Sequence, residues 1–431
     1  MKKQLLLFMS VVLSFGFGGF SDTEAPSITF GQSYNLQQRE IDKPKPIAKF
    51  NVADHVLKRY DGMNELILNG QMKDALRVAE EFVKESSYSE INVNFSTEVD
   101  IPSQTQYLMS LLYYAEVLRA YGDLKKAAEI SEKAYTVAGA LREQSPADFL
   151  LAAPIIIKSL WDMWEERPEF RKLATDYARR NYNVSENIFK YQAIQGKLAV
   201  AYGLNNSLGL RTDFRMDVLR YFDIAADIFR INPGLASFEY ASLPYYRAQA
   251  YMNRGRMEDV IVLLEKAKKE LDVVIKINHP DNLIFADIDY MAGIAYIGLF
   301  KHTEALDSLS RALEHYKRVL GNENLKVAQV LRELSIAKKY KKDFNGAIAD
   351  ALSAVDIIKT LRGNEAVELL DHYISLSGIY IDAEKEKESL EALELAKYLN
   401  AKHYSKYNDV AKLLESNIKY VKNAMGYMWK N

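Results

Sequence analysis

The chain has 431 residues, with 56 basic and 58 acidic side chains and a formal charge of −2. This near balance excludes the strong positive excess that is typical of nucleic-acid-binding proteins, so no nucleic-acid partner is expected. The length exceeds what one compact core usually supports and predicts several domains or an array of repeats. Cysteine is absent, which excludes disulfides, thiol nucleophiles and cysteine-based metal sites.

Residues 1–21 have the features of a secretory signal peptide. Two lysines are followed by an apolar run over 5–15, and Gly19 and Ser21 offer a small-x-small cleavage site. Cleavage after Ala25 and an uncleaved anchor are the alternatives. No later stretch approaches the ~20 apolar residues of a membrane span. The sequence therefore predicts a periplasmic or secreted protein without a transmembrane span in the mature chain.

Residues 22–50 contain three prolines and no helical period, which predicts a linker. Residues 51–140 then read as N-terminal helical repeats with an insertion at 86–104. Within that insertion Ile91, Val93 and Phe95 alternate with polar residues, a period of two that is typical of strands. We expect a small hairpin or flap there, either as loop packing or as a binding element.

Residues 141–235 show a weaker pattern and are predicted to be degenerate helical repeats. Amphipathic periods pair 149–164 with 170–182, and 188–202 with 214–231.

Residues 236–400 repeat themselves in register. Ala305, Ala347 and Ser389 are spaced by 42 residues, and so are the loop glycines Gly321 and Gly363. Small residues at these positions of a helix allow a second helix to approach closely. Residues 401–431 are predicted to form a final capping helix, at about 406–428, that covers the open end of the stack. Its excess of lysines indicates a solvated face or a weak patch for an acidic partner.

One segment carries a family pattern at nearly every position. Leu111, Tyr114 and Ala115 are followed by Gly122, and the small residues Ala127, Ser131 and Ala134 come next along the chain. The chain resembles the tetratricopeptide repeat (TPR) superfamily, in which helix A and helix B of each unit meet at a turn glycine. The 42-residue units look like those of kinesin light chain, although Lys342 replaces the turn glycine. The resemblance implies an all-α fold: an α-solenoid, a right-handed superhelix of roughly eight antiparallel helix pairs plus the capping helix.

Catalytic motifs are missing from the sequence. It has no His-Glu-x-x-His pair, no phosphate-binding glycine loop and no Gly-x-Ser-x-Gly elbow. Ser335 and Lys338, and Ser416 and Lys419, match Ser-x-x-Lys, but the companion motifs are absent and Ser335 occupies a packing position. We expect no enzyme, no cofactor and no metal site.

The resemblance implies that helix A lines the concave wall, where a protein or peptide partner would bind. The implied positions form a mixed polar and aromatic lining that suits an extended peptide or a helix. These positions are Glu116, Arg119, Tyr245, Gln249, Asn253, Asp287, Tyr290, Gln329, Arg332, Lys339 and Asp371.

The leading hypothesis is a non-catalytic periplasmic scaffold or adaptor that holds a partner in its concave groove. A ligand-sensing module of a signalling system is a second hypothesis. An unrecognised glycan-acting helical enzyme is a third, and it would require two acidic residues facing each other across a closed cavity.

Overall fold

A computed structural model describes most of the chain from residue 54 onward. The predicted signal peptide and linker, and residues 88–100 of the predicted insertion, lie outside the described residues. The described residues are 54–87, 101–141, 152–159, 174, 177–179, 181–182, 193–207, 218–231, 237–276, 279–404 and 409–426.

All regular structure within these residues is helical, and none of the helices has the length and hydrophobicity that crossing a bilayer requires. The helices are α2 (Asp54–Leu68), α3 (Met72–Ser86), α4 (Ile101–Tyr121), α5 (Leu124–Leu141), α8 (Ala193–Ser207), α9 (Arg220–Ile231), α10 (Ser237–Met252), α11 (Met257–Leu271) with the π-helical turn η3 (Asp272–Lys276), α12 (Ile284–Gly298), α13 (His302–Leu320), α14 (Leu325–Tyr340), α15 (Phe344–Arg362), α16 (Leu369–Asp382), α17 (Glu386–His403) and α18 (Asp409–Ala424).

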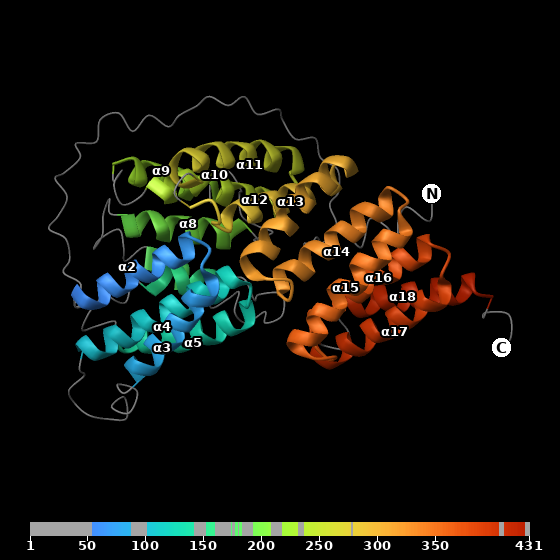
Figure 1. The fold of residues 1–431 in the computed structure, drawn as a ribbon, viewed down its shortest axis with the longest axis horizontal. Helices are drawn as coiled ribbons and strands as arrows, with labels where there is room; N and C mark the ends of the chain where they lie inside the picture. Colours follow the sequence, from blue (N-terminus) through green and yellow to red (C-terminus); the bar gives the residue numbers. More distant parts are fainter. Residues whose placement is uncertain are drawn as a thin grey trace.

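Each helix packs on the next one along the chain, and the pairs stack into a solenoid (Figure 1). Contacts are most extensive within the pairs α4–α5, α10–α11, α12–α13, α14–α15 and α16–α17, whose members are joined by short turns. The predicted all-α solenoid is therefore confirmed.

The small residues that repeat in register lie where helices approach one another. Ala305, Ala347 and Ser389 are each 0% exposed. A Cβ atom on Gly293 would lie 2.4 Å from Cγ of Leu309, so α12 and α13 come together at a distance that only glycine permits there. Close approach of this kind is what small residues on facing helices provide.

The strand-like prediction for 86–104 is wrong at both of its described ends. Ser86 is the last residue of α3, and Ile101 already begins α4. Proline is well tolerated in the first turn of a helix, where the backbone N–H has no intrahelical partner, so Pro102 does not prevent this start.

Two other boundaries differ from the expectation. In the degenerate region α8 (193–207) ends five residues beyond the predicted end at 202, and residues 188–192 of the predicted helix lie outside the described residues. The final helix α18 spans 409–424 and packs on α17, in the place predicted for the cap, while the preceding residues up to His403 still belong to α17.

The solenoid also contacts itself over more than 200 residues of sequence. Nδ1 of His279 lies 2.7 Å from Oδ1 of Asn69 in the α2–α3 turn. Nδ2 of Asn324 donates to the backbone oxygen of Tyr121 at the end of α4, at 3.0 Å. Helices α3 and α13 contact one another beside these bonds. The first two repeats therefore lie against the loops of later repeats, which closes the superhelix.

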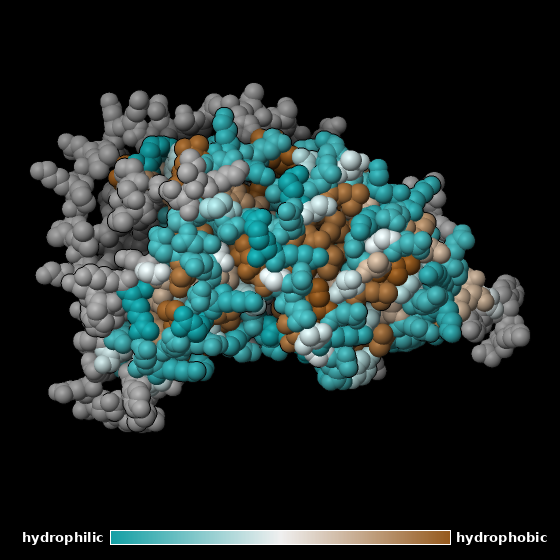
Figure 2. Space-filling model, in the orientation of Figure 1, coloured by the Kyte–Doolittle hydropathy of each residue, from teal (hydrophilic) through white to brown (hydrophobic). Residues whose placement is uncertain are grey.

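We call this set of contacts the junction. Besides the two hydrogen bonds, it contains the ion pair between Arg362 at the end of α15 and Asp123 in the α4–α5 turn. Beyond the junction, α16 to α18 extend the stack (Figure 1). Figure 2 shows a mainly hydrophilic face of the molecule with apolar residues gathered over α14 to α16.

Candidate functional site: a partly enclosed pocket behind the junction

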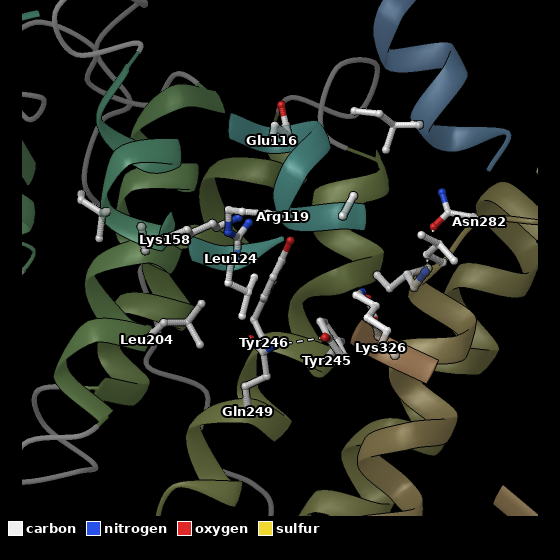
Figure 3. A pocket seen from close by; sticks show the side chains of 17 residues that line it. Glu116, Arg119, Leu124, Lys158, Leu204, Tyr245, Tyr246, Gln249, Asn282 and Lys326 are labelled. Carbon is white, nitrogen blue, oxygen red and sulfur yellow. Dashed lines mark hydrogen bonds and ion pairs between the residues drawn. The ribbon is translucent and has the colours of Figure 1, made fainter. Parts of the chain in front are cut away.

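A cavity of about 320 Å³ lies between the first two repeats and the later ones (Figure 3). Its walls come mainly from the first helix of successive pairs, which agrees with the concave placement that the TPR resemblance implies. The lining residues are Ile67, Glu116, Arg119, Ala120, Leu124, Ile157, Lys158, Ala201, Leu204, Tyr245, Tyr246, Gln249, Asn282, Leu283, Ile284, Asp287 and Lys326.

The junction turns a groove into a pocket. Asn282 and Lys326 lie in or next to the loops that the first two repeats contact, and Ile67 lies next to the α2–α3 turn. These residues therefore face the same cavity from opposite sides of the closure. At this part of the concave wall the cavity has the size that small ligands or a few peptide residues occupy.

Asp287 is the centre of a hydrogen-bonded group at one side of the pocket. Its Oδ1 accepts from Nζ of Lys326 at 2.7 Å and from the hydroxyl of Tyr316. Burial, together with the neighbouring Asp287 carboxylate, raises the pKa of Tyr316 well above its usual value, so the phenol stays protonated and donates. Lys326 and Tyr316 thus hold the carboxylate in place across the repeats α12, α13 and α14.

Tyr245 and Gln249 form a second polar group on α10. Nε2 of Gln249 donates to the hydroxyl of Tyr245 at 3.0 Å, across one helical turn (Figure 3). Burial raises the pKa of Tyr245, and the Asp287 carboxylate acts in the same direction. The phenol is therefore neutral at ordinary pH and offers a proton to a ligand acceptor.

Basic side chains stand at the opposite side of the pocket. Nζ of Lys158 lies 4.8 Å from the centroid of the Tyr246 ring, a cation–π contact. Figure 3 shows the side chains of Arg119 and Lys158 converging beside that ring. This part of the wall is formed by α4, the helical segment 152–159 and α10.

Five of the eleven positions implied by the resemblance line the pocket. They are Glu116, Arg119, Tyr245, Gln249 and Asp287.

The other six lie elsewhere. Asn253 joins α10 to α8 through a 2.8 Å bond from its Nδ2 to Oγ of Ser207. Gln329 is exposed on α14. Tyr290 packs between the two apolar cores.

The remaining three positions are charged residues that pair with one another or with neighbours in α14 and α16. Arg332 contacts Glu333 at 2.6 Å and Asp371 at 4.0 Å. Lys339 lies 3.7 Å from Asp382, and its side chain is only 4% exposed. Burial lowers the pKa of Lys339. These pairs stabilise the stack of later repeats and do not reach the pocket.

Four polar lining residues were not predicted from the sequence. Lys158 comes from the degenerate region, where no motif gives the register of helix A. Tyr246 follows Tyr245 directly, and adjacent residues usually point to different faces of a helix. Asn282 and Lys326 lie at inter-repeat loops, which reach the cavity only because the superhelix closes. The repeated spacing of those loops was the one signal that pointed to them.

The described residues contain no group of three His, Asp or Glu side chains placed to hold a metal ion. The hydroxyl of Ser335 donates to the backbone oxygen of Arg332 at 2.6 Å and is buried in α14, which is a packing role. Ser416, the other serine of a Ser-x-x-Lys match, is exposed on α18.

No family model and no curated protein matches the chain. Solved structures do. The chain is similar to a Rap protein crystallised with competence and sporulation factor, at 10% identity and a TM-score of 0.52, covering 87% of this chain and 99% of the other. It is also similar to BtubC from P. vanneervenii, at 14% identity and a TM-score of 0.35, covering 77% of this chain and 91% of the other.

A third similarity is to TPR-like repeats of a putative kinesin light chain from Podospora anserina, at 20% identity and a TM-score of 0.38, covering 48% of this chain and 93% of the other. At these identities the similarities concern the fold alone, and of the three only the Rap similarity has a TM-score above 0.5. Together with the helix pairs, their turns and their buried small residues, it shows that the chain has the fold of a TPR-type helical-repeat solenoid.

Proposed function

We propose that the protein is an exported, non-catalytic adaptor that binds a short segment of a peptide or protein partner in the partly enclosed pocket. The observation that carries this proposal is the cavity of about 320 Å³, whose walls come from repeats far apart in the sequence. A ligand there would contact both sides of the junction at once. Apolar lining residues with a few convergent polar groups are typical of ligand sites.

The pocket fits a short segment better than a whole helix. Ile67, Leu124 and Leu204 offer apolar contacts, while Gln249 and Asn282 offer amide groups that can pair with a peptide backbone. The similar Rap structure is that of a complex with competence and sporulation factor. Export is proposed from the N-terminal 21 residues, whose pattern is that of a signal peptide.

The test is retention of short peptides by the purified protein. A pool of random tetrapeptides is incubated with the protein, and the bound peptides are separated by gel filtration and identified by mass spectrometry. Ala120→Phe places a ring in the pocket, and Ala140→Phe places the same ring on the exposed face of α5. We expect retention by the wild type and by Ala140→Phe, and its loss in Ala120→Phe.

Circular dichroism checks that both variants are folded. Absence of retained peptides in the wild type would refute the proposal, and so would equal retention by both variants. Replacing Tyr245, Gln249 and Tyr290, three of the positions that the TPR resemblance implies, would be a poorer probe because Tyr290 packs against the core.

A glycan-acting enzyme is the second candidate, because two carboxylates, Glu116 and Asp287, line this partly enclosed pocket. Hydrolysis would require one carboxyl group as an acid and the other as a base or nucleophile. Asp287 already accepts bonds from Lys326 and Tyr316. Release of reducing ends from a polysaccharide, abolished by Glu116→Gln, would support this candidate against the adaptor.

A further inference from the structure

We infer that the ligand of the pocket carries a carboxylate, which binds between Arg119 and Lys158 beside the ring of Tyr246. The inference rests on the proposed function and adds the chemistry of the ligand to it. It follows from the charges on the pocket wall and from the way each charge is engaged.

Five charged residues line the pocket: Glu116, Arg119, Lys158, Asp287 and Lys326. The last two are bound to one another at 2.7 Å, and the carboxylate of that pair also accepts from the hydroxyl of Tyr316. The remaining part of the wall therefore carries two cations and one carboxylate, so it is positively charged in an empty pocket.

Lys158 has no carboxylate partner among the residues that the structure describes. Within the described part of the chain its ammonium group has an aromatic contact, 4.8 Å from the Tyr246 ring centroid, and no ion pair. A nearby lysine, Lys197, shows the contrast: its ammonium group is 2.6 Å from Glu239. A cation over a ring keeps its donors free for a further acceptor.

The placement of Arg119 completes the site. Its side chain and that of Lys158 converge from two different helices (Figure 3). Two cations that share a partly enclosed space repel each other, and the repulsion is relieved when an anion lies between them. Arginine binds a planar carboxylate through its fork of donors, and lysine adds a point charge from the second side.

The surroundings favour a carboxylate on a peptide over a free inorganic anion. Ile157, which precedes Lys158 in the chain, and Leu204 also line the pocket, and Gln249 lies further along α10 than Tyr246. An anionic group at Lys158 would thus be followed by apolar contacts and then by an amide partner. That order fits the end of a peptide chain or an acidic side chain within it.

The experiment compares matched tetrapeptide pools on the full-length protein. One pool has free C-terminal carboxylates and lacks Asp and Glu; the second is the same pool with C-terminal amides; the third has amides but contains Asp and Glu. We expect about tenfold stronger retention of carboxylate-bearing pools than of the amide pool, the effect of one charge-assisted contact. The first and third pools distinguish the terminal carboxylate from the side-chain carboxylate.

Lys158→Met should remove this preference, and Lys158→Arg should keep it. The matched control is Lys359→Met, because Lys359 also lies over a tyrosine ring, 5.9 Å from Tyr373, but outside the pocket. The control should bind like the wild type.

The outcomes separate the two proposals. Equal retention of acid and amide pools, unchanged in Lys158→Met, would overturn the carboxylate site and leave peptide binding intact. Absence of retention from every pool would overturn both. If inorganic phosphate displaced the bound peptides as effectively as acetate does, the pocket would be a general anion site. That result would also contradict the inference.

Discussion

The turns between the two helices of a repeat differ between the first repeats and the last ones. In the first two, the turn residue is Gly70 or Gly122, with φ of 71° and 97°. In the last three it is Phe300, Lys342 or Glu384, with φ between 58° and 64°. All five turn residues therefore have a left-handed backbone conformation, which residues other than glycine rarely adopt.

Space explains the difference. A Cβ atom on Gly70 would lie 2.6 Å from the backbone oxygen of Asp281, and one on Gly122 would lie 2.9 Å from Cγ of Lys326. Both glycines are thus pressed against loops of later repeats at the junction. The corresponding residues of the last repeats are exposed. Glycine is therefore favoured at these two turns for two reasons: the positive φ angle, and the close contact with the later repeats.

The largest expected effect comes from Gly70→Ala. The left-handed backbone costs about 1–2 kcal/mol for a residue with Cβ, and overpacking adds about 1–3 kcal/mol, so the free energy of unfolding should fall by about 2–5 kcal/mol. Urea denaturation measures it. Gly426→Ala is the matched control, since Gly426 has φ of 74° with open space around it. Equal losses of unfolding free energy in the two variants would show that contact with the later repeats adds nothing at Gly70.

Acid should weaken the later repeats through His372. Burial, and next the charge of Arg332, lower the pKa of His372 to about 3. Below its usual pKa near 6.5 the unfolded chain binds a proton that the folded chain does not, so stability falls as the pH drops from about 6.5 towards 3.

The expected slope is about 1.4 kcal/mol per pH unit, or about 2 kcal/mol between pH 6.5 and 5. Hydrogen exchange of α16 at the two pH values measures it. His372→Gln should flatten this dependence, and an unchanged slope in that variant would contradict the assignment.

The junction ion pair should contribute less. Arg362 and Asp123 are 26% and 20% exposed and lie on repeats separated by most of the chain. A double-mutant cycle with Arg362→Gln and Asp123→Asn should give a coupling energy of about 1–2 kcal/mol. Asparagine can still cap α5, whose Lys126 N–H donates to Asp123.

The control for the ion pair is Arg77 with Glu81, a pair on one helix that is 61% and 49% exposed. Its coupling should be about 0.3–0.5 kcal/mol. If the junction pair gave no more than this, the closure would depend on the turn glycines and hydrogen bonds alone.

The smallest effect is a gain of stability. Lys342→Gly removes the strain of a left-handed lysine and should raise the free energy of unfolding by about 1 kcal/mol. The same replacement in the interior of α5, Lys133→Gly, should lower it by about 1 kcal/mol. Thermal melts of the two variants should shift in opposite directions, and a loss in both would show that Lys342 makes contacts worth more than its strain.

The local features of the fold could be predicted from the sequence because they repeat. Ala305 and Ala347 fall at the same place in successive units, and each is buried between two helices. Turn glycines such as Gly122 follow from the backbone conformation that ends a helix. Helix pairing, the small-residue faces and the capping helix are all consequences of contacts between neighbours in the chain.

The pocket needed the tertiary structure. Five of its lining residues lie at helix A positions and follow from the repeat register, as Arg119 and Tyr245 do. Lys158 does not, because its region has lost the register. Nor does Lys326, because its place in the wall depends on contacts with the first repeats.

The sequence by itself thus determined a helical-repeat solenoid, since each helix packs mainly on residues of its own repeat and of the adjacent ones. Only the tertiary structure decided that the solenoid closes. Superhelical curvature accumulates from small rotations at every interface, and no single residue encodes their sum. That sum brings Asn69 to His279 and Tyr121 to Asn324, and so encloses the basic pocket that the first repeats share with the later ones.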